Sequence, residues 1–258
     1  MLRSRRWWAA TALWLLAYFL IVSFRFPETV HQESSAWDIY LAVMNNWMTV
    51  GYLLLPGFVF LISGSIADDM RSGYAWLIVS RASRARWWFG KVMGILLASL
   101  VYHAGFIVMT VSFGLVSGYS LAVDAQAQAT NSGLMAQSLF PPITSAVNLA
   151  IRVSTLLAYE ALAFAAIALV LVVLTLKWRR PTMPLAAVVT FEILDWVLSQ
   201  RVPAVSDLSP GRRLIEGIHF PVSGVQAPET WLASSLYFGT LLLVAYLVGA
   251  AYTHRMDF

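Results

Sequence analysis

Ionisable side chains inside apolar stretches are the residues of this sequence that could carry out chemistry. Glu192 and Asp195 are three positions apart within the apolar stretch 183–200, so a helix would place both carboxylates on one face. His103 lies at a comparable depth in another apolar stretch. Two carboxylates near a histidine can bind a cation or relay a proton. The alternative is a buried structural pair satisfied by neighbouring helices or by Arg201, and both interpretations stay open at this point.

A fourth ionisable candidate is Glu160, in the apolar stretch 149–176. Arg152 precedes it by eight residues, about two helical turns, and so lies on a similar face. The arginine can extend to the outer surface of a membrane, and we interpret the pair as structural. Glu160 still joins the three residues above as a candidate lining of a translocation path.

The composition excludes most soluble classes of protein. The chain has 258 residues, of which 59% are hydrophobic and 12% are charged. Soluble domains carry roughly 25% charged residues, so this chain has too little polar surface to cover a globule in water. The composition of this chain therefore does not fit a soluble enzyme, a disordered tail or a nucleic-acid-binding module. The absence of cysteine excludes disulfides, thiolate metal sites and a cysteine nucleophile. The sequence indicates an integral membrane protein.

Six apolar stretches are candidates for membrane spans. A helix needs roughly 20 apolar residues to cross about 30 Å of hydrocarbon. The connections between the stretches are too short for a folded soluble domain, so we expect one all-α permease-like domain over 1–258. The stretch that contains Glu192 and Asp195 is the weakest candidate. The six predicted spans are about 7–24, 47–66, 92–118, 149–176, 183–200 and 230–252.

The distribution of lysine and arginine predicts the orientation. With the N-terminus inside, twelve of the 17 cationic residues lie in cytoplasmic segments. Such an excess is the usual sign of the cytoplasmic side. The expected fold is a polytopic membrane protein with six transmembrane helices and both termini in the cytoplasm. Tryptophan pairs at 7–8 and 87–88 each follow an arginine, and we expect them to anchor the chain at the membrane interface.

The segment 67–91 combines charge and hydrophobicity in an unusual order. Asp68 and Asp69 come first, a short apolar run over 74–79 follows, and four cations precede the third predicted span. The run is too short to cross a bilayer and suits a short interfacial helix. Such a helix can rest on anionic lipid, or it can serve as a docking element for a soluble partner. Charge and hydrophobicity do not decide between the two.

This segment resembles the cytoplasmic loop between spans two and three of ABC-2-type transporter permeases. Their pattern is an acid, a base and a glycine, a short apolar turn, Ser-Pro-x-Ser-Arg, and a Gly-Lys that opens the third span. Asp69 stands where glutamate is usual, and Arg81 occupies the proline position. The resemblance covers the whole chain in layout but only about 25 residues in motif. The matching residues are Asp69, Arg71, Gly73, Leu77, Ser80, Ser83, Arg84, Gly90 and Lys91.

The resemblance implies a mechanism and a set of partners. In that family the loop is a coupling helix that docks on a cytoplasmic ATPase, and two permeases work with two ATPases. The partner would then bind ATP and magnesium, since this sequence contains no Gly-x-x-x-x-Gly-Lys-[Ser/Thr] motif. We therefore expect no enzyme activity, cofactor or metal in this chain. The docking residues would be Asp69, Arg71, Gly73, Tyr74, Trp76, Leu77, Ser80, Arg81, Ser83 and Arg84.

The expected activity is export of a hydrophobic or amphipathic compound, such as an antimicrobial peptide, a drug or a lipid. The resemblance implies a bacterial cell membrane as the location and a second permease, identical or a paralogue, as a partner. A cation- or proton-coupled secondary carrier using Glu192, Asp195 and His103 is the alternative. An intramembrane hydrolase built on Ser63-Gly64-Ser65 and His103 ranks third, because no Gly-x-Ser-Gly motif is present.

Two further patterns predict packing. Gly90-x-x-x-Gly94 and Gly114-x-x-x-Gly118 allow close approach of helices, either within the subunit or across a dimer. The segment 201–229 contains three prolines and an apolar patch. In the resembling family this position carries short helices that dip back from the outside and act as an outer gate. A plain extracellular loop is the alternative.

Overall fold

The computed structural model describes residues 5–25, 35–71, 83–121, 146–175, 182–202, 209–214 and 231–255. These residues are helical apart from short turns and one isolated bridge between Ser35 and Ser120. The predicted all-α class is therefore confirmed for the described part of the chain. Its helices are α1 (Arg5–Arg25), α2 (Ala36–Met44), α3 (Trp47–Thr49), the π-helical turn η2 (Val50–Leu54), α4 (Leu55–Arg71), α6 (Arg84–Val116), α8 (Ala146–Thr175), α9 (Thr182–Arg201), α11 (Pro210–Arg213) and α12 (Trp231–Arg255).

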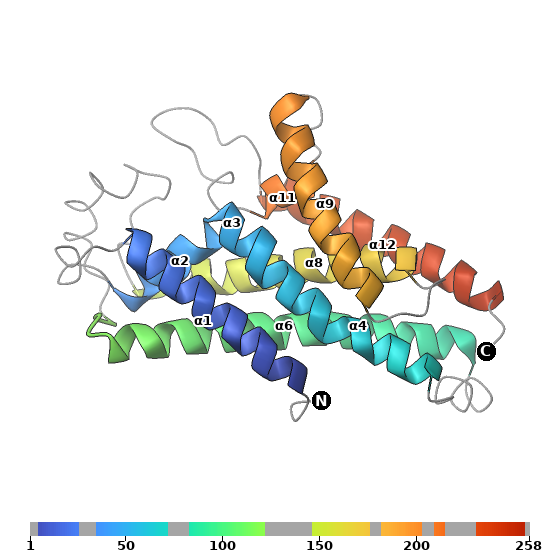
Figure 1. Cartoon of the computed structure of the whole chain (residues 1–258), viewed down its shortest axis with the longest axis horizontal. Helices are drawn as coiled ribbons and strands as arrows, with labels where there is room; N and C mark the ends of the chain where they lie inside the picture. The colour runs from blue at the N-terminus through green and yellow to red at the C-terminus, as the bar shows by residue number, and fades with distance from the viewer. Residues whose placement is uncertain are drawn as a thin grey trace.

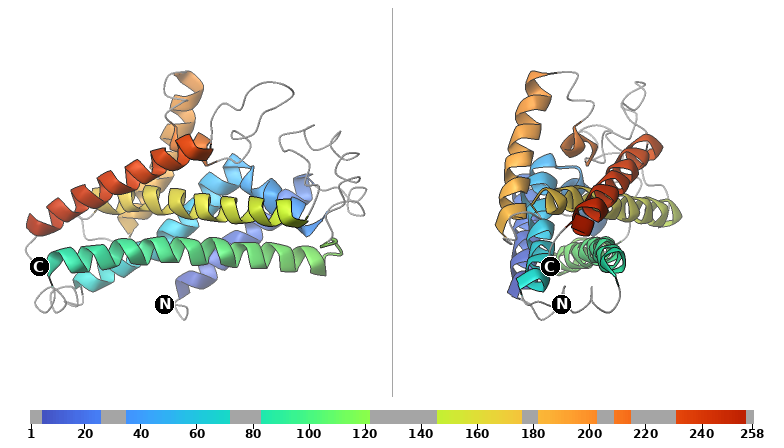
Figure 2. Two further views of the ribbon diagram at one scale, coloured as in Figure 1. Left: turned by 180° about the vertical axis from the view of Figure 1, so that it is seen from behind. Right: turned by 90° about the vertical axis from the view of Figure 1, so that its right-hand side faces the viewer.

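The long helices form a bundle with one steeply inclined member (Figures 1 and 2). Helices α6, α8 and α12 run lengthwise and pack against one another. Helices α1 and α4 pack together across one side of this layer. Helix α9 crosses the bundle steeply and packs on α4 and α8. The short helix α11 lies beside α9, near the beginning of α12.

Four helices of the described part are long and apolar enough to cross a membrane. They correspond to the first, third, fourth and sixth predicted spans. The second predicted span is helical, but its apolar part is the shorter stretch Val50–Ser63. The fifth is helix α9, which is not among the four, so six spans and cytoplasmic termini stay predictions. The four candidate spans are Arg6–Ser23, Arg84–Val116, Leu149–Leu174 and Trp231–Arg255.

Helix α6 begins earlier than the apolar pattern predicts. It has 33 residues and starts at Arg84, whereas the apolar stretch starts at 92. Ser83 caps its first turn, since the Ser83 hydroxyl accepts a hydrogen bond from the N–H of Arg86. At about 1.5 Å per residue the helix is about 50 Å long, which exceeds the hydrocarbon thickness. The last eight residues of segment 67–91 are thus the first part of a long helix.

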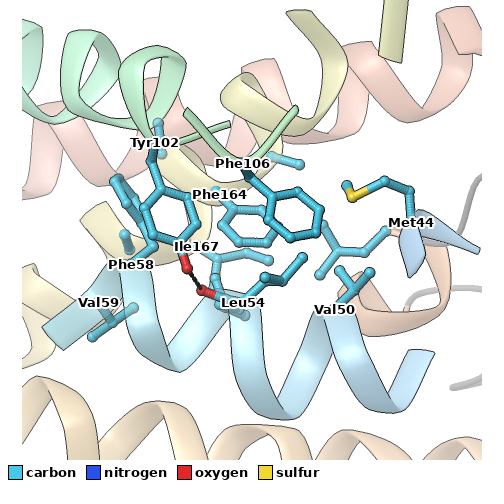
Figure 3. Packing of buried hydrophobic residues seen from close by; sticks show 14 of the residues in the cluster. Met44, Val50, Leu54, Phe58, Val59, Tyr102, Phe106, Phe164 and Ile167 are labelled. Atoms are coloured by element: carbon cyan, nitrogen blue, oxygen red, sulfur yellow. Dashed lines mark hydrogen bonds between the residues drawn. The ribbon is translucent and has the colours of Figure 1, made fainter. Parts of the chain in front are cut away.

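The core lies where α4, α6 and α8 meet (Figure 3). Helix α8 is central, because every side chain from 163 to 169 is buried and four of these residues are alanines. Small side chains let neighbouring helices approach closely in a membrane bundle. Aromatic rings from the neighbours fill the remaining space: Tyr102 of α6 packs with Phe58 of α4 and Phe164 of α8. Phe106 of α6 is buried in the same core (Figure 3).

The connection between the first two predicted spans contains the helix α2. Ser35 and Asp38 form a capping box at its start, and this favours a helix at that point. The N–H of Ala36 donates to the carbonyl of Ser120 over 2.9 Å, which ties α2 to the end of α6. A Cβ on Gly114 would lie 2.7 Å from the Ala36 Cβ. Gly114 therefore serves close packing within the chain, as one of the two predicted interpretations has it.

Candidate functional site

The carboxylates of Glu192 and Asp195 meet where α9 faces α11. A Cβ on Gly211 would lie 3.6 Å from Oε2 of Glu192 and would collide with an oxygen of Asp195. The two acids therefore share one face of α9, as their spacing of three predicts. In the described part of the chain neither carboxylate forms an ion pair. Two acidic groups thus lie close together without a cationic side chain between them.

Asp195 is held by hydrogen bonds from α11. The hydroxyl of Ser209 donates to its Oδ2 over 2.6 Å, and the N–H of Gly211 donates to the same oxygen over 3.1 Å. Ser209 is also the N-cap of α11, since its hydroxyl accepts the N–H of Arg212 over 3.0 Å. Pro210 occupies the first helical position, where its missing N–H costs nothing. The Ser-Pro-Gly order thus fixes Asp195 in place.

Glu192 has no comparable support. Its side chain is only 5% exposed, and its Oε1 has no hydrogen-bond partner. Its Oε2 packs against Gly51, where a Cβ would lie 2.5 Å from that oxygen. A side chain at position 51 would require the Glu192 carboxylate to shift. A buried acid without a donor is costly in an apolar environment, and this sets Glu192 apart from Asp195.

Gly51 belongs to the π-helical turn η2, and Pro56 explains the turn. The N–H of Leu55 donates to the carbonyl of Val50, five residues back, instead of to Gly51. Pro56 has no N–H to donate to the Gly51 carbonyl in a π-helical pattern. The Gly51 carbonyl therefore receives neither the α-helical hydrogen bond from Leu55 nor a π-helical one from residue 56. Single π-helical turns are frequent at functional sites.

Helix α6 supports this distorted stretch from the other side. The hydroxyl of Tyr102 donates to the carbonyl of Leu54 over 2.8 Å, as the dashed line in Figure 3 shows. A Cβ on Gly57 would lie 2.9 Å from the Tyr102 hydroxyl. The absence of a side chain at Gly57 lets the phenol reach the helix backbone. The π-helical turn is thus anchored in the aromatic core.

Arg213 of α11 is a buried residue that the sequence analysis does not single out. Its Nη1 donates to the Ser234 hydroxyl over 3.3 Å, and its guanidinium lies 4.8 Å from the centre of the Tyr237 ring. Its carbonyl accepts the hydroxyl of Tyr159 over 2.5 Å. The described part of 201–229 therefore folds back onto α8, α9 and α12. The N-cap serine followed by proline at 209–210 is the sequence signal for this turn.

His103 packs against Phe164 of α8 and contacts its own helix at Ser99. Its Nδ1 is 2.8 Å from the carbonyl of Ser99, one turn earlier in α6. Its ring packs edge-on against Phe164 of α8, with centroids 4.4 Å apart, and its Nε2 has no hydrogen-bond partner. No hydrogen bond or ion pair joins it to Glu192 or Asp195. Glu160 is fully buried in α8. The structure thus brings together two of the four predicted path residues.

The predicted docking residues lie in and beside the connection between α4 and α6. Asp69 and Arg71 belong to the last turns of α4. Arg84 opens α6, and its Nη1 donates to the carbonyl of His254 at the end of α12 over 2.5 Å. Ser83 is the N-cap described above. The remaining predicted docking residues lie outside the described residues: Gly73, Tyr74, Trp76, Leu77, Ser80 and Arg81.

The sequence pattern predicts that Trp87 and Trp88 face the membrane interface, but the structure places both inside the bundle. Both side chains are buried. The Nε1–H of Trp88 donates to the carbonyl of Tyr246 over 2.9 Å, and its indole fills the space above Gly249 of α12. Trp88 therefore fastens α6 to α12. Trp8, at the start of α1, is 76% exposed and fits the interfacial prediction.

Comparison with protein-family models, curated proteins and solved structures finds no significant match for this chain. Among the described residues, no three histidine, cysteine, aspartate or glutamate side chains come together as a metal site. The structure therefore presents two features with functional potential. One is the junction between α6 and α12 beside the 72–82 connection, and the other is the cluster of Glu192 and Asp195.

Proposed function

We propose that the chain is the membrane-spanning permease subunit of an ATP-driven transporter, energised by a separate cytoplasmic ATPase. The transported compound would be hydrophobic or amphipathic, such as a peptide, a drug or a lipid. The resemblance of segment 67–91 to a coupling loop motivates this proposal. The observation that carries it is the bracing of this segment's end against α12 through Arg84 and Trp88.

The geometry suits the transmission of movement. A partner that displaced the connection between α4 and α6 would move the first turn of α6. Since this turn holds α12 at His254 and at Tyr246, α12 would move with it. Helix α12 contacts α11 at Ser234, twenty positions before His254, which is about 30 Å along a helix. One rigid element therefore spans from the docking end to the carboxylate cluster.

A pull-down of the tagged chain from native membranes in mild detergent tests the proposal. We expect a stoichiometric soluble ATPase in the eluate, and we expect Arg84→Glu combined with polar substitutions over 74–79 to remove it. Arg86→Glu is the matched control, because Arg86 is exposed on the same helical turn and no hydrogen bond in the described residues joins its side chain to α12. Recovery of an intact chain without an ATPase, under conditions that preserve a known transporter complex, would contradict the proposal.

A cation- or proton-coupled carrier is the second candidate function. The observation that favours it is the proximity of Glu192 and Asp195 beside the π-helical turn η2. The carrier would bind its cation or proton at Glu192 and Asp195 and not at His103, which packs on α8. Transport that persists in Glu192→Gln with Asp195→Asn, with an unchanged pH dependence, would contradict it.

A further inference from the structure

We propose that the π-helical turn η2 is a hinge in the helix that runs through residues 47–71, and that the hydroxyl of Tyr102 is the latch that holds this hinge. The device goes beyond the proposed function and does not depend on it, because the bending of a helix needs no ATPase. The turn ends at Leu54, and α4 continues from there to Arg71, the residue before the 72–82 connection.

The backbone of the turn lacks two α-helical hydrogen bonds in a row. The N–H of Leu55 donates to Val50, so the Gly51 carbonyl loses its α-helical donor. The Tyr52 carbonyl loses its α-helical donor because the residue four positions on is Pro56, which has no N–H. Sharp bends in helices occur almost always at features such as prolines and single π-helical turns, and this helix has both here. The chain can therefore bend at η2 at a lower cost than elsewhere in the helix.

Two glycines flank this stretch and bring neighbouring helices to its backbone. Gly51 lies against α9, where a Cβ would be 2.5 Å from Oε2 of Glu192. Gly57 lies against α6, where a Cβ would be 2.9 Å from the hydroxyl of Tyr102. Glycine adopts more backbone conformations than any other residue, because it has no Cβ. The two positions at the edges of the hinge therefore allow a change of backbone angles that a larger residue would resist.

Tyr102 supplies the hydrogen bond that holds the turn in the observed form. Its fully buried hydroxyl donates to the carbonyl of Leu54 over 2.8 Å (Figure 3). Its ring is held by Phe58 of α4 and Trp14 of α1, with centroids 5.5 and 5.0 Å away. Inside a membrane, an interrupted helix is tolerated where neighbouring helices bond to its backbone. Here a single oxygen atom of α6 does so, and its removal should release the hinge.

Helix α4 converts a small bend into a larger displacement. It has 17 residues, which span about 25 Å at about 1.5 Å per residue. A bend of about 10° at η2 would therefore move the far end of α4 by about 4 Å. That end precedes the 72–82 connection, whereas the turn itself contacts Glu192 through Gly51. Under the proposed function, a movement of the docked connection would thus change the contact between Gly51 and Glu192.

Two spin labels placed on either side of η2 test the hinge by an electron paramagnetic resonance distance measurement on the full chain. The natural chain contains no cysteine, so Met48→Cys and Met70→Cys provide the two attachment sites. Met48 is 57% exposed and precedes the turn, and Met70 belongs to the last turn of α4. About 33 Å of helix separates the two positions. We expect Tyr102→Phe to at least double the width of the distance distribution.

Two further variants distinguish a hinge from a general loosening of the core. Tyr18→Phe is the matched control, because it removes the hydrogen bond of another buried tyrosine, to Ser117, and should leave the distribution unchanged. Pro56→Ala restores the missing N–H, so its addition to Tyr102→Phe should return the distribution to its original width. An unchanged distribution in Tyr102→Phe, equal broadening in Tyr18→Phe, or no narrowing by Pro56→Ala would each overturn the inference.

Hydrogen–deuterium exchange of the unaltered chain keeps the inference falsifiable if the variants do not fold. The amides of residues 50–55 should exchange at least tenfold faster than those of residues 163–169, which are buried in the regular helix α8. Equal exchange rates in the two segments would overturn the hinge. Neither measurement involves an ATPase, so a failure of the hinge and a failure of the ATPase pull-down are distinguishable.

Discussion

The junction of α6 with α12 and the cluster on α9 differ in whether two key polar side chains have hydrogen-bond partners: Trp88 has one, and Oε1 of Glu192 has none. At the junction, the indole N–H of Trp88 and the guanidinium of Arg84 each donate to a backbone carbonyl of α12. In the cluster, Glu192 is buried as Trp88 is, but one of its oxygens has no partner. The first region is built to hold two helices together, and the second keeps a costly group in the bundle.

This difference indicates that the junction stabilises the fold, whereas the cluster lowers the stability of the fold. A satisfied hydrogen bond contributes about 0.5–1.5 kcal/mol, whereas an unsatisfied buried group costs about 1–3 kcal/mol and more when it is charged. Substitutions at the junction should therefore lower stability. Substitution of Glu192 should raise it, because natural sites often sacrifice stability for activity. Four substitutions test this contrast, each by the sign of its effect on the free energy of unfolding.

The largest expected effect is that of Trp88→Ala. It removes a fully buried indole together with its hydrogen bond to α12, and such truncations cost about 3–5 kcal/mol. Thermal unfolding in detergent, followed by tryptophan fluorescence, measures the loss. Trp8→Ala is the control, since that side chain is 76% exposed. Equal midpoints for the two variants would show that the junction does not hold α6 to α12.

Gly249→Ala should destabilise the same junction by overpacking, by about 1–3 kcal/mol. A methyl group there would occupy the position of the Trp88 ring. Gly239→Ala is a control in the same helix, because no atom lies near its Cβ position. There the alanine should stabilise α12 by up to about 1 kcal/mol. If both glycines respond alike, the close contact of Trp88 with Gly249 is not present in solution.

Glu192→Gln should stabilise the chain by about 1–3 kcal/mol, because it replaces a buried carboxyl group whose Oε1 has no hydrogen-bond partner. Asp38→Asn is the matched control. The carboxylate of Asp38 accepts the N–H and the hydroxyl of Ser35, so its loss should destabilise α2. Opposite signs in the two unfolding midpoints support the contrast between free and satisfied acids. Destabilisation by both would make Glu192 a structural acid.

The smallest expected effect is that of Ser209→Ala, about 1–2 kcal/mol of destabilisation. The substitution removes both the N-cap of α11 and a donor to Asp195. Ser154→Ala, on the exposed face of α8, should leave the unfolding midpoint nearly unchanged. Hydrogen–deuterium exchange over 209–214 reports the same loss locally. Unaltered exchange there would show that α11 does not depend on the Ser209 hydroxyl.

Part of the site could be predicted from the sequence because it depends on neighbours along one helix. The spacing of Glu192 and Asp195 places them on a common face wherever a helix forms. The partners of that face could not be predicted. Gly51 and Ser209 come from distant segments, and nothing in their local sequence indicates which helix they will meet. The grouping with His103 was assumed from similar depth alone, and depth does not specify the side of a helix.

Orientation of the tryptophan pair shows the same limit. An arginine followed by two tryptophans indicates a position near a membrane surface. It does not say whether the rings face lipid or a neighbouring helix. In the structure Gly249 provides the space that accepts Trp88, and 161 residues separate the two positions. The residue types therefore predicted that this segment lies near a membrane surface, and the packing of helices set the direction in which the tryptophan rings point.

The sequence predicted the all-helical class and six apolar spans, four of which are helices long and apolar enough to cross a membrane in the described part of the chain. It also contains the local signals that start helices, the Ser35 capping box and the Ser209–Pro210 turn, which were recognised only in the structure. These features follow from hydropathy and short-range hydrogen bonding, which act within a few residues. Only the tertiary structure decided that Asp195 is satisfied and Glu192 is not. That distinction depends on which donors distant helices bring to each carboxylate, and a helical pattern contains no information about them.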